Sequence, residues 1–289
     1  MSAIESLHAF VNRWECDEND HMNVQFYFAK FQEADRQFAA MTGLTGSLVG
    51  ARRVRHIRYH REVTAGTLLR VLSSIAFDGP HMFSVLHEMI DVSSGTLVAA
   101  AMDGYSPSAK TAQSLRPRFI EYESSANADN SPLGIGPSVA GMSMTAKSLL
   151  ARGARVVHQN TVMPRDCGPD SRADDQFLAG CFSDGAAHVW ERTPMNRSWL
   201  ESNGYGRVAV EMKLSYGTAL KMGSSVQVVS GITGMGSKTF SFRHHVFDVV
   251  SGAAVAMVDV VALSLDLKTR KAVELPKSAV TELQALRIL

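Results

Sequence analysis

The sequence predicts an α+β protein made of two tandem domains, each a long helix wrapped by an antiparallel sheet. Three observations predict this fold class. A set of residues recurs at fixed spacing in the two halves, and each half contains one long segment with helical apolar periodicity. Each half then continues with short apolar runs separated by glycine-containing turns. A length of 289 residues also suits two domains of ordinary size.

The internal repeat is visible as two constant offsets. At an offset of 151 residues, Cys16, Gln25, Phe26 and Phe31 reappear as Cys167, Gln176, Phe177 and Phe182. At an offset of 157 residues, Tyr59, Gly66, Phe83, His87, Asp91, Gly95 and Ala99 reappear as Tyr216, Gly223, Phe240, His244, Asp248, Gly252 and Ala256. The difference of six residues between the offsets indicates one insertion in the second copy. So many matches in two registers indicate a duplicated domain.

Within each copy the elements follow one order. A short strand, at about 9–14 in the first copy, leads into a polar loop and then a helix. The helix is predicted by an apolar stripe at helical spacing, ended by Gly43: Val24, Tyr27, Phe28, Phe31, Ala34, Phe38 and Met41. Strands are expected at about 54–59, 67–77, 82–92 and 96–103, and in the second copy at 208–216, 224–232, 238–249 and 254–265. Turn residues at 93–95 and 251–252 indicate antiparallel hairpins.

The domain boundaries follow from the repeat. We expect an N-terminal domain at 1–121, a linker at 122–152 and a C-terminal domain at 153–289. The linker begins with a polar, breaker-rich stretch that suits an exposed connection. Short helices are expected at 142–150, inside the linker, and at 279–289, where apolar residues at helical spacing suggest a closing helix.

The composition excludes several classes of protein. Apolar residues make up 45% of the chain, charged residues 20%, and the net charge of +1 gives no argument for a nucleic acid or a membrane as partner. No secretory leader is visible, and no apolar run approaches the roughly 20 residues that span a membrane. The three cysteines, Cys16, Cys167 and Cys181, cannot all pair and lack metal-binding spacing. We therefore expect a cytoplasmic protein with no metal and no redox cofactor.

The candidate functional site is the loop before the first helix. Asp17, Asn19 and His21 put a carboxylate, an amide and an imidazole on alternate positions, so an extended loop can direct all three toward one pocket. Each residue alone is more often a helix cap or a solvated side chain. The second copy argues for function, because its loop keeps the framework residues but has lost these groups. The corresponding positions hold Gly168, Asp170 and Arg172.

A strand, a polar loop, a buried helix and a strand meander resemble the hotdog fold, and two copies resemble the double hotdog arrangement. The segment Asp17–Asn23, with Tyr27 beyond it, is similar to the Asp-x-Asn-x-His-Val-Asn signature of acyl-acyl carrier protein thioesterases. It also resembles the Asp-containing loop of 4-hydroxybenzoyl-CoA thioesterase-like enzymes. Arg58–Glu62 resembles the Tyr-Arg-Arg-Glu segment that supplies a catalytic glutamate in the plant acyl carrier protein thioesterases, whose signature lies in the second repeat instead of the first.

Carried over to this chain, the resemblance implies Asp17, Asn19, His21 and Glu62 as catalytic residues, with Ala219 in the place of Glu62 in the second copy. It implies a thioesterase that hydrolyses an acyl-CoA, or an acyl-acyl carrier protein, to a free acid and a thiol. Coenzyme A would then enter as part of the substrate and not as a cofactor. The sequence leaves open which carboxylate attacks the thioester or activates water.

Substrate contacts are expected at the start of the first helix and in a basic run after it. Backbone amides at Met22, Asn23 and Val24 lie at the positive end of the helix, where a thioester carbonyl would be polarised. Tyr27 lies one turn further along. Arg52, Arg53, Arg55, Arg58 and Arg61 form the basic run. This run is either a solvated edge or a site for the phosphates of coenzyme A or for an acidic carrier protein, with Arg58 and Arg61 as the candidates.

Other interpretations stay open beside hydrolysis. Cys16 as a nucleophile is less favoured than a small buried residue, because Cys167 lies in the copy that has lost the other groups. A hotdog hydratase acting on enoyl thioesters and a non-catalytic acyl-CoA-binding module are the alternative functions. Hotdog domains normally pair, so we expect pairing of the two domains within the chain, with a homodimer as a further possibility. The acyl group is not predicted.

Overall fold

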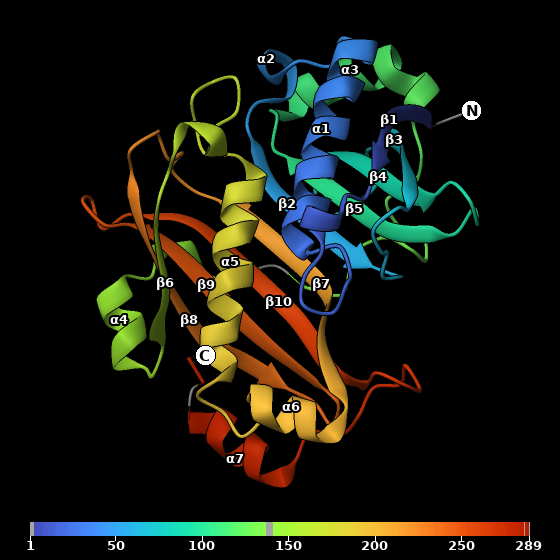
Figure 1. Ribbon diagram of the computed structural model, residues 1–289. Coiled ribbons are helices and arrows are strands. Elements are labelled where there is room, and N and C mark those ends of the chain that lie inside the picture. Colours follow the sequence, from blue (N-terminus) through green and yellow to red (C-terminus); the bar gives the residue numbers. More distant parts are fainter. Residues whose placement is uncertain (1–2, 137–140, 286, 289) are drawn as a thin grey trace. The chain divides into compact units, whose positions relative to one another are not determined.

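The computed structural model describes residues 3–136, 141–285, 287 and 288, and its chain divides into two compact units, Met1–Gly134 and Ile135–Leu289 (Figure 1). The segment expected as a linker, 122–152, is therefore shared between the two units. Four of its residues, 137–140, lie outside the described residues, as do residues 286 and 289 of the expected closing helix. Each unit is an α+β fold with one long helix on an antiparallel sheet, as the sequence predicts.

The first unit contains a five-stranded sheet with the strand order β1-β3-β4-β5-β2, and every neighbouring pair is antiparallel. Its elements are β1 (Ile4–Phe10), α1 (Val24–Thr42), α2 (Gly46–Val49), β2 (Arg52–Tyr59), β3 (Leu68–Ala76), β4 (Phe83–Asp91), β5 (Leu97–Tyr105) and α3 (Ala109–Phe119). Short 3-10 turns lie at Arg13–Glu15 and Ile120–Tyr122. The helix α1 packs across one face of the sheet, against β1, β3 and β4.

The second unit repeats this arrangement with the strand order β7-β10-β9-β8-β6, again antiparallel throughout. Its elements are α4 (Ala146–Ala151), β6 (Arg155–Thr161), α5 (Asp175–Trp190), α6 (Arg197–Asn203), β7 (Tyr205–Tyr216), β8 (Ser225–Met235), β9 (Thr239–Asp248), β10 (Ala254–Asp266) and α7 (Lys277–Ala285). Short 3-10 turns lie at Gly141–Ser143 and Pro164–Asp166. The helix α5 packs against β6 and β8.

The strand register confirms the offset of 157 residues in three dimensions. Ser73 lies opposite His87 in the β3–β4 pair, and Ser230 lies opposite His244 in the β8–β9 pair. In both pairs the serine hydroxyl bonds the histidine Nδ1, at 2.7 Å between Ser73 and His87. The repeat seen in the sequence is therefore a repeat of strand pairing as well as of residue type.

The helix α1 begins and ends where the sequence predicts. The side chain of Asn23 accepts a hydrogen bond from the Gln25 N–H at 3.1 Å, which caps the first turn and contributes about 1 kcal/mol. At the other end Gly43 has φ 72°, a left-handed conformation that glycine adopts without steric cost. The buried side chains of α1 lie on the predicted stripe: Tyr27, Phe28, Phe31, Ala34 and Phe38.

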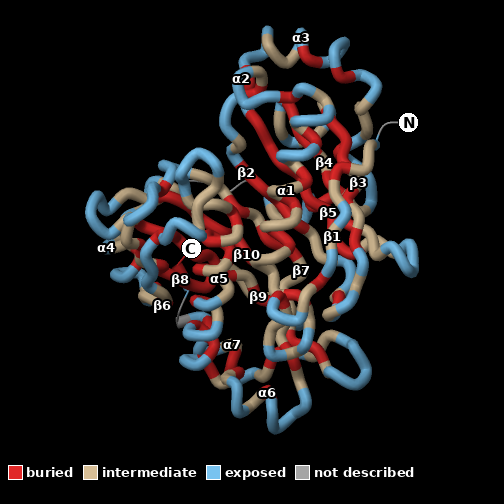
Figure 2. Tube along the Cα trace, turned by 45° about the horizontal axis from the view of Figure 1, so that its top comes forward, coloured by how far each residue is buried: buried red, intermediate tan, exposed pale blue. Residues whose placement is uncertain are grey.

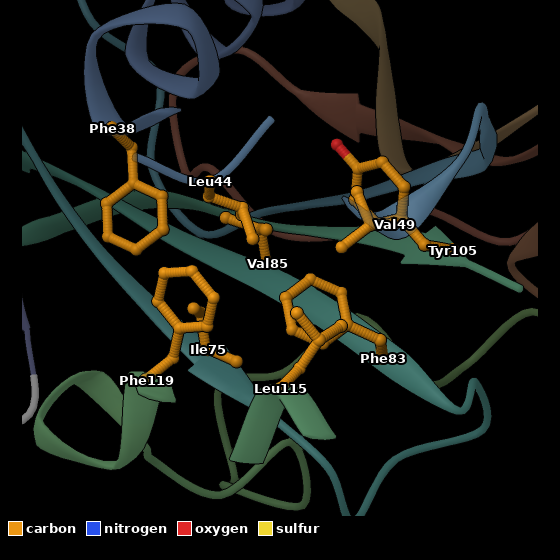
Figure 3. Close-up of a cluster of buried hydrophobic side chains, with 9 residues drawn as sticks. All are labelled: Phe38, Leu44, Val49, Ile75, Phe83, Val85, Tyr105, Leu115 and Phe119. Atoms are coloured by element: carbon orange, nitrogen blue, oxygen red, sulfur yellow. The ribbon is translucent and has the colours of Figure 1, made fainter. Parts of the chain in front are cut away.

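The far end of α1 packs on a cluster of nine buried side chains, which come from α1, α2, the segment between them, β3, β4, β5 and α3 (Figure 3). They are Phe38, Leu44, Val49, Ile75, Phe83, Val85, Tyr105, Leu115 and Phe119. Each large apolar side chain removed from water in this way contributes about 1.5–3 kcal/mol. Figure 2 shows the inner strands β5 and β10 as almost continuously buried, while the turns between strands are exposed.

The first strand and three of the helices differ from the sequence prediction. The first strand lies at Ile4–Phe10 and not at about 9–14. The Glu15 carboxylate accepts a hydrogen bond from the Asn12 N–H at 2.8 Å, so the chain turns there in a 3-10 conformation and leaves Trp14 77% exposed. The helices α2, α3 and α6 were not predicted. In α3 only Leu115 and Phe119 of the eleven residues are buried, so the apolar pattern is weak. No helix within the described part of the chain combines the length and the apolar character needed to cross a membrane.

Candidate functional site

The loop before α1 is closed by its own backbone. Cys16 and Met22 form an antiparallel bridge, and the Asp17 N–H donates to the His21 carbonyl at 2.8 Å. The Asp20 N–H donates to the Asp17 carbonyl at 3.1 Å, and Asp20 adopts a left-handed conformation with φ 60°. These contacts form a tight loop, and the chain continues from it directly into α1.

The loop of the second repeat has the same backbone conformation. Cys167 and Ala173 form the corresponding bridge, and the Gly168 N–H donates to the Arg172 carbonyl at 2.8 Å. Ser171 takes the place of Asp20, with φ 59° and a hydrogen bond to the Gly168 carbonyl at 3.0 Å. Because glycine supports this loop as well as aspartate does, the loop conformation does not depend on the Asp17 side chain.

The carboxylate of Asp17 is half-buried, and one of its oxygens is held by the loop. Oδ1 accepts the backbone N–H of Asn19 at 2.8 Å and that of His21 at 3.3 Å. Oδ2 accepts no hydrogen bond from the described residues. Burial raises the pKa of Asp17 above its ordinary value of 3.8, the neighbouring charge of Glu18 adds to the increase, and the two backbone donors partly offset it. A carboxylate with one fixed and one open oxygen and a raised pKa is suited to accept a proton.

His21 and Glu62 lie together beside this carboxylate loop. His21 Nδ1 is 3.6 Å from Glu62 Oε1, with 23% and 29% of the two side chains exposed. The loop is joined to the segment after β2 by a bridge between His21 and Thr64. Glu62 lies in that segment, three residues beyond the end of β2 and not within a strand. The second repeat keeps the bridge, between Arg172 and Lys221, but has no acid–base pair there.

The backbone amides at the start of α1 are less available than the sequence suggests. The Met22 N–H donates to the Val63 carbonyl and the Asn23 N–H to the Glu15 carbonyl, both at 2.8 Å. The Val24 N–H has no hydrogen-bond partner among the described residues. Of the three amides expected to bind a carbonyl, two are used by the loop itself, which leaves the Val24 N–H as the remaining candidate.

Tyr27 is buried one turn into α1. Its ring meets the edge of Tyr59, with centroids 5.0 Å apart and an angle of 83° between the planes. Burial holds the pKa of Tyr27 well above its ordinary value, and the negative charge of Asp17 raises it further. The phenol therefore stays protonated beside the loop. Leu178 holds the corresponding position in the second repeat.

The basic run divides into two parts with different surroundings. Arg58 Nη1 donates to the Asp129 carbonyl at 3.0 Å, and the exposed Arg61 donates to the Thr96 hydroxyl at 3.3 Å. Arg55 is fully buried, and 14% of the Arg52 side chain is exposed. The interpretation of the run as a solvated edge or a phosphate site therefore does not hold for Arg52 and Arg55, which face the interior.

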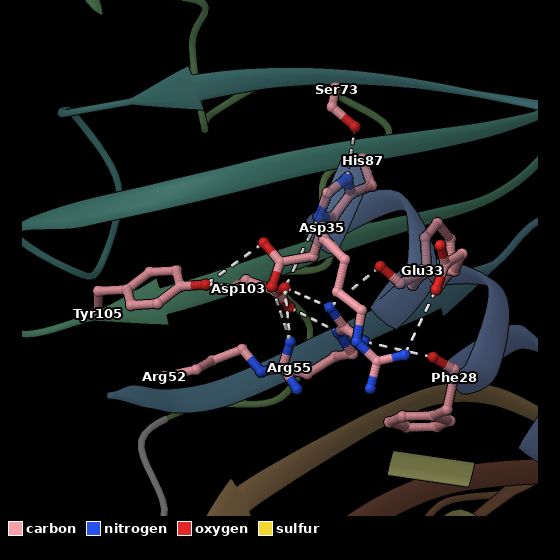
Figure 4. A network of polar contacts seen from close by, with 11 residues as sticks. Phe28, Glu33, Asp35, Arg52, Arg55, Ser73, His87, Asp103 and Tyr105 are labelled. Carbon is pink, nitrogen blue, oxygen red and sulfur yellow. Dashed lines mark hydrogen bonds and ion pairs between the residues drawn. The ribbon is translucent and has the colours of Figure 1, made fainter. Parts of the chain in front are cut away.

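Arg52 and Arg55 belong to a polar network that sequence reasoning missed (Figure 4). Arg55 Nε donates to Asp103 Oδ1 at 2.7 Å, and Arg52 Nη1 lies 3.2 Å from Asp103 Oδ2 and 3.3 Å from Asp35 Oδ2. Burial alone would raise the pKa of Asp103, but the charges of Arg55 and Arg52 hold it well below its usual range. The signal for this network is the repeat itself, since the positions of Arg55 and Asp103 hold apolar residues in the second copy.

The same network contains the cluster of potential metal ligands found among the described residues. Ligand atoms of Asp35, His87 and Asp103 lie within 4.8 Å of one another. Both carboxylates are already neutralised by guanidinium groups, at 2.7 to 3.3 Å. The chemistry of this cluster is therefore that of an ion-pair network and not that of a metal site.

Comparison with known proteins identifies the family. A family model described as the thioesterase-like superfamily matches residues 11–105 and 173–283, one match in each repeat. A solved structure of a putative oleoyl thioesterase from Lactobacillus plantarum is similar, with a TM-score of 0.63, 12% identity and coverage of 91% of this chain and 97% of that chain. No curated protein sequence matches this chain.

Two further solved structures share the fold. The 12:0-ACP thioesterase from Umbellularia californica has a TM-score of 0.61 and 12% identity, and the match covers 91% of this chain and 94% of that chain. An acyl-ACP thioesterase from Bacteroides thetaiotaomicron has a TM-score of 0.59 and 9% identity, with coverage of 90% and 98%. At these identities the similarity establishes the fold, which is the double hotdog predicted from the sequence.

Proposed function

Because the chain belongs to the thioesterase-like superfamily, we propose that it hydrolyses an acyl thioester at the loop of its first repeat. One observation carries the proposal: two loops with matching backbone hydrogen bonds differ in the side chains that can react. The first loop brings together a half-buried carboxylate, an imidazole and a second carboxylate at the mouth of a helix. The second holds Gly168, Arg172 and Ala219 in their places.

In the proposed reaction Asp17 acts as the general base. The open oxygen of Asp17 takes a proton from water, and the resulting hydroxide adds to the thioester carbonyl carbon. The Val24 N–H, at the positive end of α1, donates to the oxygen that becomes negative. The C–S bond then breaks, and the departing thiolate takes a proton from the His21 imidazolium, whose charge Glu62 stabilises at 3.6 Å. The proton held by Asp17 then passes through water to His21, which restores both groups. The products are one carboxylic acid and one thiol.

Asn19 and Tyr27 have supporting roles in this proposal. Asn19 fixes the direction of the Asp17 carboxylate through its backbone N–H at 2.8 Å. Tyr27, protonated and buried beside the loop, limits the space for the acyl group and keeps the carboxylate partly desolvated. Direct attack by Asp17, which would form a mixed anhydride, is the alternative route. Single turnover in ¹⁸O-labelled water tests this route. Label in Asp17 would establish the anhydride, because it enters only when water attacks the aspartyl carbonyl of that intermediate.

We propose a fatty acyl-CoA as the substrate, with a fatty acyl-acyl carrier protein as the second candidate. The second candidate is favoured by the names of two relatives, which are described as a 12:0-ACP thioesterase and an acyl-ACP thioesterase. Neither candidate requires a metal or a redox cofactor, since the acid, base and carbonyl-binding groups are all protein groups. Arg58 and Arg61 remain candidates for the carrier phosphates, with Arg61 the more exposed of the two.

A thiol-release assay over a panel of acyl-CoAs, from acetyl to palmitoyl with aromatic and charged groups, tests the proposal. The same acyl groups on acyl carrier protein form the second arm. We expect turnover of at least one member and equal release of thiol and acid. Loss of enoyl absorbance without thiol release would instead identify a hydratase. Tight binding of acyl-CoA without turnover anywhere in the panel would identify a binding module.

A further inference from the structure

Arg55 forms a buried link between two strands of the first repeat (Figure 4). It lies on β2 directly opposite Asp103 on β5, and neither side chain has any exposed surface. The guanidinium engages both oxygens of Asp103, with Nε to Oδ1 at 2.7 Å and Nη2 to Oδ2 as the second bond. A bidentate pair of this kind fixes the orientation of the guanidinium plane as well as its position.

The same guanidinium reaches across to α1. Arg55 Nη1 donates to the Phe28 carbonyl and Nη2 donates to the Phe31 carbonyl, both at 3.3 Å. These carbonyls lie on consecutive turns of the helix, so the contact fixes both the height of α1 above the sheet and its rotation. One side chain therefore joins three elements: β2, β5 and α1.

Two of these elements lead directly to the reacting groups. The helix α1 begins at Val24, immediately after the loop that carries Asp17 and His21. The strand β2 ends at Tyr59, three residues before Glu62. The 3.6 Å separation of His21 Nδ1 and Glu62 Oε1 therefore depends on how α1 and β2 are placed against each other. Arg55 lies four residues before the end of β2 and fixes how α1 and β2 are placed against each other.

The second repeat provides the comparison, because it has no acid–base pair to align. Met212 and Val260 face each other in the β7–β10 pair at the positions of Arg55 and Asp103, and both are buried. Three further members of the network, Asp35, Arg52 and Tyr105, are replaced by Ala186, Ala209 and Ala262. A hotdog domain of this chain therefore folds with an apolar interior at these positions.

What the second repeat keeps is the serine–histidine pair, Ser230 and His244. Burial and the neighbouring His245 lower the pKa of His244 to about 3, so this imidazole is neutral. The serine–histidine pair therefore belongs to the shared fold, while an ion pair at the positions of Arg55 and Asp103 belongs to the first repeat.

Burying a charged pair commonly stabilises a fold no better than apolar residues of similar volume do. The second repeat buries an arginine–aspartate pair of its own, Arg243 and Asp259 on β9 and β10. Particular to the first repeat is a pair at the positions of Arg55 and Asp103, where the guanidinium also reaches the carbonyls of the helix, and this placement calls for a reason other than folding.

We infer that Arg55, held by Asp103, is a positioning residue for the hydrolysis proposed above: it fixes α1 against β2 so that His21 and Glu62 meet. It touches neither the substrate nor the reacting atoms and acts through the helix carbonyls. The inference rests on the proposed function for its catalytic consequence. The structural part, the alignment of His21 with Glu62, can be measured separately.

The test is the double variant Arg55→Met/Asp103→Val, which gives the first repeat the residues of the second. Both charges leave together, so no unpaired charge stays buried. We expect the fold to be retained, kcat to fall about 10- to 100-fold and KM to change less than about twofold, because misaligned groups slow chemistry more than binding. Met212→Leu, in the second repeat, is the matched control and should leave kcat unchanged.

A second readout does not depend on turnover. The imidazole ¹⁵N chemical shifts of His21, assigned by their loss in His21→Ala, report its contact with Glu62. In the double variant they should move toward the values of Glu62→Gln. Unchanged shifts together with wild-type kcat would overturn the inference. Absence of thioester hydrolysis in the wild-type protein would instead reject the proposed function, and the shifts would still decide the positioning role.

The variant Arg55→Lys covers the case in which the double variant does not fold. A lysine can reach the Asp103 carboxylate or a helix carbonyl, but it cannot reproduce the planar fork that does both. We expect a smaller fall in kcat, about threefold to tenfold by the same misalignment argument, with unchanged circular dichroism. Wild-type kcat in this variant would contradict the inference.

Discussion

The loops at 16–23 and 167–174 share one backbone and differ in chemistry. Each is closed by a bridge between its ends, each has a left-handed residue at the same point, and each runs into a helix. The first loop holds a carboxylate and an imidazole where the second holds a glycine and an arginine. The backbone of this loop is therefore specified by hydrogen bonds that both sets of side chains permit. Its side chains are therefore free to serve another purpose.

The same contrast extends from the loop into the interior. Ser73 and His87 in the first unit match Ser230 and His244 in the second, and both pairs are hydrogen-bonded. At the positions of Arg55 and Asp103 the second unit has buried apolar residues, and its own buried arginine–aspartate pair, Arg243 and Asp259, lies elsewhere in the sheet. Within one chain, features common to both repeats belong to the fold. Features of the first repeat alone accompany its reactive loop.

The largest expected effect comes from removing the reactive carboxylate. Asp17→Asn keeps the shape of the side chain but cannot accept a proton from water. We expect kcat to fall by about 10²- to 10⁴-fold, the usual contribution of a general base. The thermal midpoint should stay close to wild type, because the loop of the second repeat forms with glycine at this position. Thiol-release kinetics measure kcat, and thermal denaturation measures the midpoint.

The matched control for this variant lies in the second loop. Asp170→Asn changes an exposed acid at the position that corresponds to Asn19, and we expect wild-type kcat. If Asp170→Asn lowered kcat as much as Asp17→Asn does, the second loop would also take part in the reaction. The contrast between the repeats would then be lost.

The next largest effect is on the free energy of unfolding. It tests the Arg55–Asp103 pair in the interior of the first unit, where the second unit has apolar residues. Arg55→Met alone leaves Asp103 buried with only part of its counter-charge, and we expect a loss of about 3–5 kcal/mol in the free energy of unfolding. Adding Asp103→Val should recover most of this loss. A double-mutant cycle by urea denaturation measures the coupling between the two residues.

Met212→Leu is the control in the second interior and should cost less than about 1.5 kcal/mol, because it changes shape and not charge. A cycle with no coupling between Arg55 and Asp103 would mean that the bidentate contact contributes nothing to the first unit. The difference between the interiors would then be one of composition only.

The sequence predicts the architecture well because the apolar patterns of helices and of strands are both local. The stripe that ends at Gly43 and the strands from Arg52 onward follow from neighbours within a few residues. The reactive loop is also visible in the sequence, because Asp17 and His21 lie close together. The second repeat, whose loop lacks these reactive groups, shows which residues can replace them.

What the sequence does not predict depends on contacts between distant segments. The amides of Met22 and Asn23 are used by the carbonyls of Val63 and Glu15, which helix geometry alone does not indicate. In the sequence, Arg55 could not be distinguished from the other arginines of the basic run, because its partner Asp103 lies 48 residues away. A buried charge is recognisable only when its partner is known, and pairing between strands supplies that partner.

The dependence of activity on pH gives a smaller effect that belongs to the first loop. The pKa of Asp17 is raised above 3.8, chiefly by burial, and the proposed base must be ionised. The value of kcat/KM should therefore fall as the pH falls through this raised pKa, so the acid limb lies above pH 3.8. The residual activity of Asp17→Asn should lack that limb. An acid limb that persists unchanged in the variant would assign it to another group.

The same shift has a consequence for stability with a defined sign. In the folded protein Asp17 keeps its proton to a higher pH than in the unfolded chain. Its contribution therefore favours the folded state at low pH and decreases as the pH rises through the raised pKa. In Asp17→Asn this decrease should disappear, and the difference in thermal midpoint between wild type and variant, followed across that pH range, measures it.

The smallest expected effect is the most direct test of the shared backbone. Gly168 is not among the glycines with positive φ, so an aspartate can take its place without backbone strain. In Gly168→Asp the new carboxylate would find the backbone N–H of Asp170, as the Asp17 carboxylate finds that of Asn19 at 2.8 Å, whereas the Arg172 N–H already donates to the Asp170 carboxylate. We expect the free energy of unfolding to change by less than about 0.5 kcal/mol, the range of a compatible surface substitution. Urea denaturation measures it, with Gly168→Ala as the control for lost backbone freedom. A loss of several kcal/mol in Gly168→Asp alone would show that the two loops differ in more than their side chains, because a carboxylate accepted by one backbone would be rejected by the other.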